Sequence, residues 1–375
     1  MAGRNVLVTG GAGFVGTHLV DALLERGDRV RVFDNLDSQV HGPDQQRPRW
    51  LSEEAELMIG DMRDADAVAR AVRGMDIIYH LAAAVGVGQS MYRIAPYTAT
   101  NTLGTAHLLQ VLVDREIELE RLVVASSMSI YGEGRYIRSD GGAPMVLQRS
   151  ADQLRRREWE LRDADGVVLQ PRHTDEAKPL DPTSIYALTK ADQERMTLQI
   201  GDAYGIPSVA LRFFNIYGPR QALSNPYTGV AAIFSARLLN GNAPLIFEDG
   251  EQSRDFVSVH DIVQALLLSV DREEVVGQAL NVGSGRSITV REVGETLARV
   301  LGVEIEPEVT GRYRVGDIRH CYADISRARD LLGYEPRVSL ENGMTELVAW
   351  LQEQERPEDG IQHHAAELAA RGLTV

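Results

Sequence analysis

A phenol and an ammonium stand four residues apart at Tyr186 and Lys190, in a segment predicted to be helical over 184–204. Because an α-helix brings residues four apart onto one face, both side chains can serve the same site. A tyrosine titrates at about pH 10, and a nearby cation favours its phenolate, so we expect the pKa of Tyr186 to fall toward neutrality. Such a tyrosine can take a proton from a hydroxyl group while a hydride leaves the same carbon. Taken alone, this spacing also occurs in helices that have no catalytic role.

Hydroxyl groups gather at Ser126, Ser127 and Ser129, directly after an apolar segment predicted to be a strand over 121–125. In open α/β sheets, ligands bind outside the carboxyl ends of the strands. A serine at this place can hold a reacting oxygen and share its proton with Tyr186. The alternative is that these serines only close the strand.

A glycine-rich turn contains Gly10, Gly13 and Gly16, between a predicted strand at 6–8 and a predicted helix at 14–26. The first glycine permits a sharp turn, the second lets the backbone approach a pyrophosphate, and the third lets helix and strand pack closely. The N–H groups at the start of the helix then point at an anion. The pattern therefore predicts a dinucleotide site, and a packing role alone is the alternative.

The next predicted strand, at 30–33, ends at Asp34. This carboxylate lies about 20 residues past the turn, where it can accept hydrogen bonds from an adenosine ribose. Because it would repel a 2′-phosphate, Asp34 favours NAD over NADP. The alternative is a turn residue before Asn35.

Strands and helices alternate through the first part of the chain. Further strands are predicted at 56–59, 76–80 and 208–213, and a long helix at 95–115. Repeated strand–helix units with short apolar strands predict an α/β fold with a doubly wound parallel sheet, covered on both faces.

Two segments interrupt this alternation. Residues 37–52 are predicted to be a loop, and 133–182 has no clear sheet pattern. Inside the second segment, the mixed-charge run at 150–162 is predicted to be a solvated helix rather than a binding patch.

Beyond residue 215 the alternation loosens. The pattern predicts helices at 230–240 and 261–270 and short strands at 245–247 and 255–259. These elements predict a smaller α/β lobe that closes over the edge of the sheet where a ligand sits. We therefore divide the chain into 1–215 with the insertion 133–182, a partly interleaved lobe at 216–350, and a tail at 351–375 with a helix at 365–371.

The composition excludes several classes of function. The chain has 375 residues, 44% of them hydrophobic and 25% charged, as in soluble enzymes. Its net charge of −15 and the lack of a basic block argue against a nucleic-acid partner. With Cys321 as the single cysteine, no internal disulfide and no cysteine-rich zinc site are expected. No apolar run reaches about 18 residues, so we predict no signal peptide, no membrane span and a cytoplasmic location.

Together these segments resemble the extended short-chain dehydrogenase/reductase family, and within it the NAD-dependent nucleotide-sugar epimerases and dehydratases. The likeness covers about residues 4 to 350 and rests on the glycine turn at 9–16, His80 to Ala83, Asn101 to Thr105, Ser127 with Tyr131-Gly132, and Tyr186 with Lys190. The resemblance implies a Rossmann-like domain, bound NAD and a nucleotide-diphosphate sugar as substrate.

The resemblance also implies roles for individual residues. Ser127, Tyr186 and Lys190 match the catalytic residues. Matches to cofactor contacts, together with the residues of the turn, are Gly10, Gly13, Phe14, Val15, Gly16, Asp34, Asn35, Leu36, Asp37, Ser38, Asp61, Met62, Leu81, Ala82, Ala83, Asn101, Ser126, Tyr186, Lys190 and Phe214. Substrate contacts are implied at Ser127, Ser129, Asn215, Val230, Leu245, Ile246, Phe247, Arg254, Arg314 and Asp317.

Within the substrate set, Arg254 matches a diphosphate-binding arginine, and Arg314 and Asp317 match a phosphate and ribose pair. A guanidinium can bind a diphosphate through two parallel hydrogen bonds, which supports this role on physical grounds. Without the motif, Arg254 would be read equally well as a surface arginine. Asn215 matches a contact to the sugar diphosphate, and residues 245–247 would flank the nucleotide base.

The two residues after Ser127 narrow the reaction. Dehydratases of the family carry Asp-Glu directly after the catalytic residue, and decarboxylases carry Glu two places after it, whereas this chain has Met128 and Ser129. What remains is epimerisation at C4 through a transient 4-keto sugar. A net 4-ketoreductase or dehydrogenase, and a non-catalytic NAD-binding regulatory or scaffold protein, are the alternatives.

Some features depart from the common pattern. Galactose-type 4-epimerases commonly carry a lysine where this chain has Val85, and the insertion 133–182 resembles that of dTDP-L-rhamnose 4-epimerases. We therefore expect a dTDP-hexose first and a UDP-hexose second. Those relatives often have cysteines in the insertion, and this one has none, so no metal is expected and His173 is predicted to be a surface residue.

Many relatives pair through the two long helices of the sheet domain, so a homodimer is expected. The corresponding helices here are 95–115 and 184–204. The second offers the apolar candidates Leu188, Ala191, Met196, Leu198 and Ile200.

Overall fold

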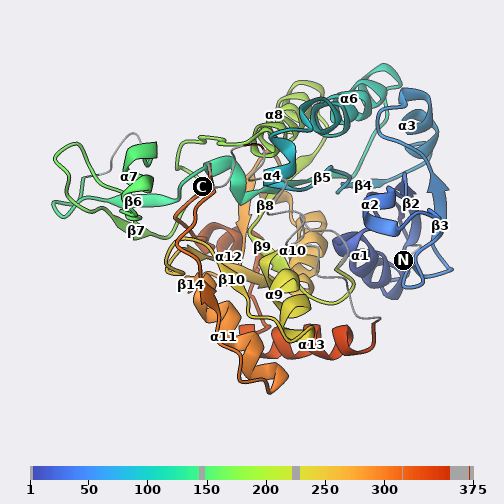
Figure 1. The fold of residues 1–375 in the computed structure, drawn as a ribbon. Coiled ribbons are helices and arrows are strands. Elements are labelled where there is room, and N and C mark those ends of the chain that lie inside the picture. The colour runs from blue at the N-terminus through green and yellow to red at the C-terminus, as the bar shows by residue number, and fades with distance from the viewer. Residues whose placement is uncertain (1–2, 143–147, 222–228, 315, 355–370, 372–375) are drawn as a thin grey trace.

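Seven short apolar strands form the central sheet of the protein (Figure 1). The computed structural model describes residues 3–142, 148–221, 229–314, 316–354 and 371. The strands are β1 Asn5–Thr9, β2 Arg29–Asp34, β3 Glu56–Ile59, β4 Ile77–His80, β5 Arg121–Ser127, β8 Ser208–Phe213 and β13 Ala279–Val282. All pair in parallel, in the order β13-β8-β5-β4-β1-β2-β3.

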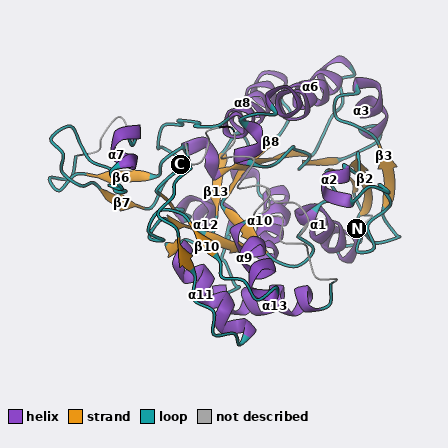
Figure 2. Cartoon of the chain, in the orientation of Figure 1, coloured by secondary structure: helices purple, strands orange, loops and turns teal. Residues whose placement is uncertain are grey.

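Helices cover both faces of this sheet, as Figure 2 shows. On one face lie α1 Phe14–Glu25, α10 Val259–Asp271 and α12 Ser326–Leu332, and on the other lie α3 Ala65–Ala71, α6 Gly104–Asp114 and α8 Ile185–Tyr204. Each face has its own apolar core, with Leu19, Leu23 and Ile262 in the first and Val68, Leu108 and Leu112 in the second. The predicted α/β fold with a doubly wound parallel sheet is therefore confirmed.

The smaller lobe is built on α9 Val230–Leu239, α11 Val290–Leu301 and α13 Leu340–Gln352, which share a core around Phe234, Leu297 and Leu347. Short strands connect it to the sheet domain. They are β9 Asn215–Tyr217 with β12 Phe256–Ser258, β10 Leu245–Ile246 with β15 Glu308–Val309, and β14 Ile288–Thr289, β11 Ser253–Arg254 and β16 His320–Cys321. Since β13, α10 and α12 pack with the first sheet, the two lobes are interleaved; the boundary at 215 stays a prediction.

The insertion projects from the body of the molecule on the left of Figure 1. Its strands β6 Arg135–Ile137 and β7 Gln170–Arg172 pair antiparallel, and a small core joins Tyr136, Leu161 and Leu169. The predicted helix at 150–162 is too long, because α7 covers only Ala151–Arg155. The following residues turn back toward the smaller lobe.

Other boundaries also differ from the predictions. The helix expected at 95–115 is three consecutive pieces, α5 Ile94–Tyr97, the π-helix η1 Thr98–Leu103 and α6. The expected loop at 37–52 contains the short helix α2 Ser38–His41. Further short helices are α4 Val87–Ser90, η2 Met128–Tyr131 and η3 Glu273–Val275. The tail helix predicted at 365–371 falls almost wholly outside the described residues, and within the described part no helix combines the length and apolarity needed to span a membrane.

Candidate active site

The end of β5 and the start of α8 bring Ser127 and Tyr186 together. The Ser184 hydroxyl caps α8 by accepting the Ala187 backbone N–H at 3.1 Å, and the Tyr186 backbone N–H donates to the Ser90 hydroxyl at 3.0 Å. With its backbone fixed in this way, the Tyr186 phenol lies close enough to the Ser127 side chain for that side chain to act on its pKa.

The protonation of Tyr186 differs from the expectation. Burial raises the pKa of Tyr186 above its usual value, and the influence of the Ser127 side chain opposes this only in part. The expected lowering is therefore not found in the protein alone. The physical reason is burial of the phenol, while the Lys190 ammonium donates to the Gln193 side chain at 2.8 Å and not to the phenol.

Lys190 lies at the end of a buried polar chain. Gln193 donates in turn to the Thr105 hydroxyl at 2.8 Å, and the His80 ring contacts the hydroxyls of Thr105 at 2.9 Å and Thr9 at 2.8 Å. Burial lowers the pKa of Lys190 to about 7, although Glu194 acts to raise it. Burial, with the nearby Lys190 charge, also lowers the pKa of His80 to about 3, so this imidazole is neutral.

The glycine turn has the geometry of an anion cradle. Gly10 has φ of +70°, and a Cβ there would lie 2.8 Å from the Ala82 backbone. A Cβ on Gly16 would lie 2.4 Å from the Gly10 carbonyl oxygen. No side chain caps α1 at Gly13, and the first N–H groups of a helix have no acceptor within it. The turn therefore fits a pyrophosphate, which those N–H groups would bind.

The Asp34 carboxylate is fixed at the end of β2. Its two oxygens accept the backbone N–H groups of Ala12, at 3.1 Å, and Leu36, at 2.9 Å. It therefore ties the glycine turn to the following loop, as the alternative of a turn residue anticipated, and its contact with a ribose stays a prediction. The next residue, Asn35, donates to Asp61 beyond the neighbouring strand β3, and a hydrogen bond from Arg63 lowers the pKa of Asp61 to about 2.

Asn101 clamps the loop that follows β4, which holds the predicted contacts Leu81, Ala82 and Ala83. Its side chain accepts the Ala84 N–H at 2.7 Å and donates to the Ala84 carbonyl at 3.0 Å. Other predicted contacts point inward, because the side chains of Leu36, Met62 and Phe214 are buried in the core. Only their backbone atoms can face a cofactor.

The smaller lobe gathers most of the predicted substrate residues. The Arg254 guanidinium contacts the Asp317 carboxylate at 3.4 Å and donates to the backbone carbonyls of Ser253, Arg319 and Ile318. The exposed Arg314 guanidinium lies 4.3 Å from the centre of the Phe247 ring.

Three further predicted substrate residues have different surroundings. The Asn215 amide oxygen is buried and has no hydrogen-bond partner among the described residues, as suits a group that meets a ligand. Ile246 is fully buried in the lobe's core and Val230 begins α9, and their contacts with a nucleotide stay predictions. The described residues contain no group of His, Cys, Asp or Glu side chains suited to a metal ion. His173 is exposed, and its ring packs against the Tyr322 ring.

Comparison with known proteins agrees with this geometry. The profile of the NAD dependent epimerase/dehydratase family matches residues 6–150, and that of GDP-mannose 4,6 dehydratase matches residues 166–347. A dTDP-L-rhamnose 4-epimerase from Burkholderia thailandensis is 36% identical over 93% of this chain and 95% of its own length. The chain belongs to the NAD-dependent epimerase/dehydratase family.

Solved structures of the family agree over the whole fold. A UDP-glucose 4-epimerase from Thermotoga maritima, determined with UDP-glucose, matches with a TM-score of 0.76 and 30% identity over 93% of this chain and 99% of that one. A UDP-glucose 4-epimerase from Thermus thermophilus, determined with NAD, matches with a TM-score of 0.74 and 29% identity over 94% and 100%.

Sequence reasoning missed two supports of this family site. The Glu194 carboxylate accepts the Ser126 hydroxyl at 2.6 Å and pairs with Arg212 on β8 at 2.6 Å, all of them buried. Gln193 holds the Lys190 ammonium. Both lie three or four residues after Lys190, so the helical spacing that linked Tyr186 to Lys190 could also have indicated them.

Proposed function

We propose that the protein is an NAD-dependent nucleotide-sugar 4-epimerase, an isomerase that acts through a transient 4-keto sugar. The observation that carries this proposal is the proximity of Ser127, at the end of β5, to Tyr186, at the start of α8, close enough for the Ser127 side chain to act on the pKa of the phenol. Only β4 lies between β5 and the strand β1 that leads into the glycine turn. The 4-epimerases among the relatives and solved structures support the same activity.

The surroundings of Ser127 support epimerisation over water loss or decarboxylation. Met128 is buried, and the Ser129 hydroxyl donates to the Ser127 hydroxyl at 2.9 Å. Neither side chain can act as a carboxylate that moves a second proton. A reaction that needs one proton shuttle and one hydride acceptor fits this set of residues.

In the proposed mechanism, Ser127 holds the C4 hydroxyl of the sugar and Tyr186 takes its proton. Bound NAD would supply the hydride acceptor and a positive ring charge that favours the phenolate. Lys190 adds a cation four residues along the same helix. After the keto sugar turns over, the hydride would return to the opposite face of C4 and Tyr186 returns the proton to the oxygen, so no net redox change results. In this proposal Gly10, Gly13, Gly16 and Asp34 hold the dinucleotide.

The proposal also assigns the contacts to the nucleotide sugar. Arg254 would bind the diphosphate, with Asn215, Arg314, Asp317 and Phe247 around the nucleotide. A dTDP-hexose is proposed first because of the 36% identical relative, and a UDP-hexose second because of the structural neighbours. A cytoplasmic location belongs to the same proposal.

The function is tested by incubating the purified protein with dTDP-, UDP-, GDP- and CDP-sugars without added NAD. An epimerase turns over many times on the dinucleotide it retains, whereas a ketoreductase or dehydrogenase stalls after one turnover. Tyr186→Phe should abolish turnover and leave the NAD content unchanged. Tyr204→Phe, at the exposed end of the same helix, is the matched control and should behave like the wild type. Unchanged turnover in Tyr186→Phe would contradict the assignment of the base.

A homodimer through α6 and α8 is part of the proposal. Leu188 is 49% exposed and Leu103 is 46% exposed, which leaves apolar surface on this side of the molecule. In contrast, Ala191 is buried and Met196 and Ile200 pack against the core under α8, so these three expected contacts face largely inward. Light scattering at micromolar concentration that shows monomer alone would exclude a stable dimer.

A further inference from the structure

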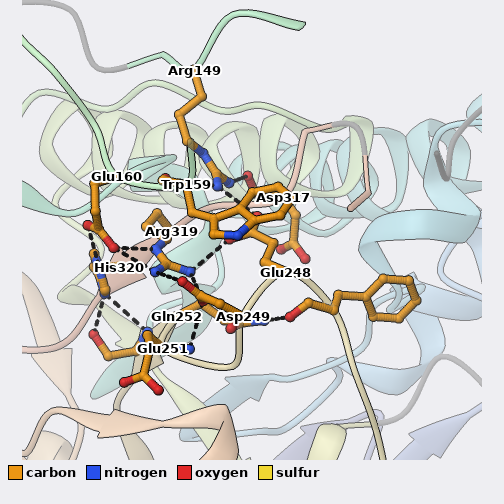
Figure 3. Close-up of polar contacts among 12 residues, drawn as sticks. Arg149, Trp159, Glu160, Glu248, Asp249, Glu251, Gln252, Asp317, Arg319 and His320 are labelled. Carbon is orange, nitrogen blue, oxygen red and sulfur yellow. Dashed lines mark hydrogen bonds and ion pairs between the residues drawn. The ribbon is translucent and has the colours of Figure 1, made fainter. Parts of the chain in front are cut away.

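The insertion contacts the smaller lobe through a cluster of buried charges (Figure 3). Arg149, whose side chain is almost fully buried, donates to the Glu248 carboxylate at 2.7 Å and to the Asp317 backbone carbonyl at 2.8 Å. Arg149 belongs to the insertion, and the other two belong to loops that carry predicted substrate residues. The insertion is thus joined to the substrate side by side chains that the mechanism does not use.

A second inserted residue, Glu160, joins the same cluster through Arg319, which also pairs with Glu248 at 2.9 Å. Its carboxylate accepts two hydrogen bonds from the Arg319 guanidinium, at 2.6 and 3.0 Å, and faces the His320 ring at 3.2 Å. Arg319 is only 1% exposed. Hydrogen bonds from His320 and Arg319 lower the pKa of Glu160 to about 2, so the carboxylate is charged at neutral pH.

Both connections converge on Arg254. The Asp317 residue held by Arg149 places its carboxylate 3.4 Å from the Arg254 guanidinium. The Arg319 residue held by Glu160 places its backbone carbonyl 2.9 Å from the same guanidinium. A guanidinium forms two parallel hydrogen bonds with a phosphate only when its plane is correctly oriented. Each inserted residue therefore acts on that orientation through one intermediate residue.

We infer that Arg149 and Glu160 are positioning residues that orient Arg254, and that the insertion thereby sets the affinity for the diphosphate of a nucleotide sugar. This inference rests on the proposed function, since it is there that Arg254 is assigned to the diphosphate. It gives the insertion a role in substrate affinity, beyond its own small core.

The test compares the binding of a nucleoside diphosphate with that of the matching monophosphate. Dissociation constants are measured by calorimetry for UDP against UMP and for dTDP against dTMP, and the pair with the tighter diphosphate is used. Glu160→Gln and Arg149→Gln should weaken binding of the diphosphate by about threefold to thirtyfold, which lies within the range of coupling in a shared hydrogen-bond network. The monophosphate should change by less than about twofold, which lies within the scatter of independent sites.

Three further variants complete the comparison. Arg254→Gln sets the loss expected when the diphosphate contact is removed outright. Glu158→Gln is the matched control, because Glu158 lies two residues from Glu160 in the insertion but pairs with the exposed Arg156. Glu158→Gln should leave both affinities unchanged. If Glu160→Gln does not fold, Arg149→Lys keeps the charge, removes the forked donors and provides the same comparison.

The outcomes separate the inference from the function on which it rests. Loss of discrimination in Arg254→Gln but not in the Arg149 and Glu160 variants would overturn the inference alone. Equal weakening of both nucleotides, with a lower unfolding temperature, would show that the cluster only holds the fold and would also overturn it. Unchanged discrimination in Arg254→Gln would overturn the diphosphate assignment and the inference together, while the turnover assay would still decide the epimerase function.

Discussion

Replacing Glu194 with Gln should destabilise the protein far more than removing an exposed ion pair. Glu194 is 3% exposed and its partner Arg212 is 7% exposed. Arg212 donates to both carboxylate oxygens, at 2.6 Å from Nη2 and 3.0 Å from Nε, and the Ser126 hydroxyl donates to one of them at 2.6 Å. The amide in Glu194→Gln would keep one acceptor oxygen and point an N–H₂ group at donors.

The magnitude follows from burial. Removing one partner of a buried ion pair leaves the other charge without compensation and costs about 3–5 kcal/mol. Arg212 keeps its hydrogen bond to the Tyr131 hydroxyl at 2.7 Å, which does not neutralise the guanidinium, so a loss of about 4 kcal/mol is expected. The matched control is Glu335→Gln, which removes an exposed pair with Arg329 and should cost about 0–1 kcal/mol.

The assay is urea unfolding of protein stripped of dinucleotide, since a bound ligand would add its own stabilisation. The free energies of unfolding of wild type, Glu194→Gln and Glu335→Gln are compared at neutral pH. The reasoning is refuted if the Glu194 and Glu335 variants agree within about 1 kcal/mol, the value of an exposed pair. Because Glu194 also joins α8 to β5, turnover should fall in the first variant and persist in the second.

The remaining predictions concern the cradle, the lysine and the proposed dimer. Gly16→Ala should greatly reduce the NAD content of the purified protein, because its Cβ would lie 2.4 Å from the Gly10 carbonyl oxygen, whereas Gly142→Ala, in an exposed turn, should retain it. Without dinucleotide, Lys190 has a pKa of about 7 in the folded protein and about 10.4 in the unfolded chain. Between these values the unfolded chain binds more protons, so the free energy of unfolding should rise with pH. Urea unfolding at both ends of the window should show that rise in wild type and not in Lys190→Met. Leu188→Glu should shift light scattering toward monomer, and an unchanged dimer would exclude this helix from the interface.

The sequence was informative wherever local spacing determines structure. The turn from β1 into α1 and the helix α8 are determined by glycine placement, periodicity and capping within their own segments. The structure places most of their boundaries within one residue of the prediction. The alternation of apolar strands with helices was sufficient to predict the parallel sheet, because such strands must be buried on both faces.

What the sequence could not show depends on contacts between distant residues. The charges at 150–162 have the local pattern of a solvated helix, yet Glu160 pairs with the buried Arg319 from the other lobe. The spacing of Tyr186 and Lys190 places them on one face, but it does not determine what the ammonium contacts, and Gln193 takes that hydrogen bond. Likewise, the motif at 245–247 does not reveal that Ile246 points into the core.

The edge strand β13 limits how the chain can be cut into fragments or recombined with a related protein. It comes from residues 279–282, between α9 and α11 of the smaller lobe, yet it completes the sheet beside β8. A fragment that stops near residue 215 would leave the β8 edge open and would also lack α10, which packs against α1. Exchanging the two lobes between proteins as separate stretches of sequence would therefore divide this sheet between the two parents.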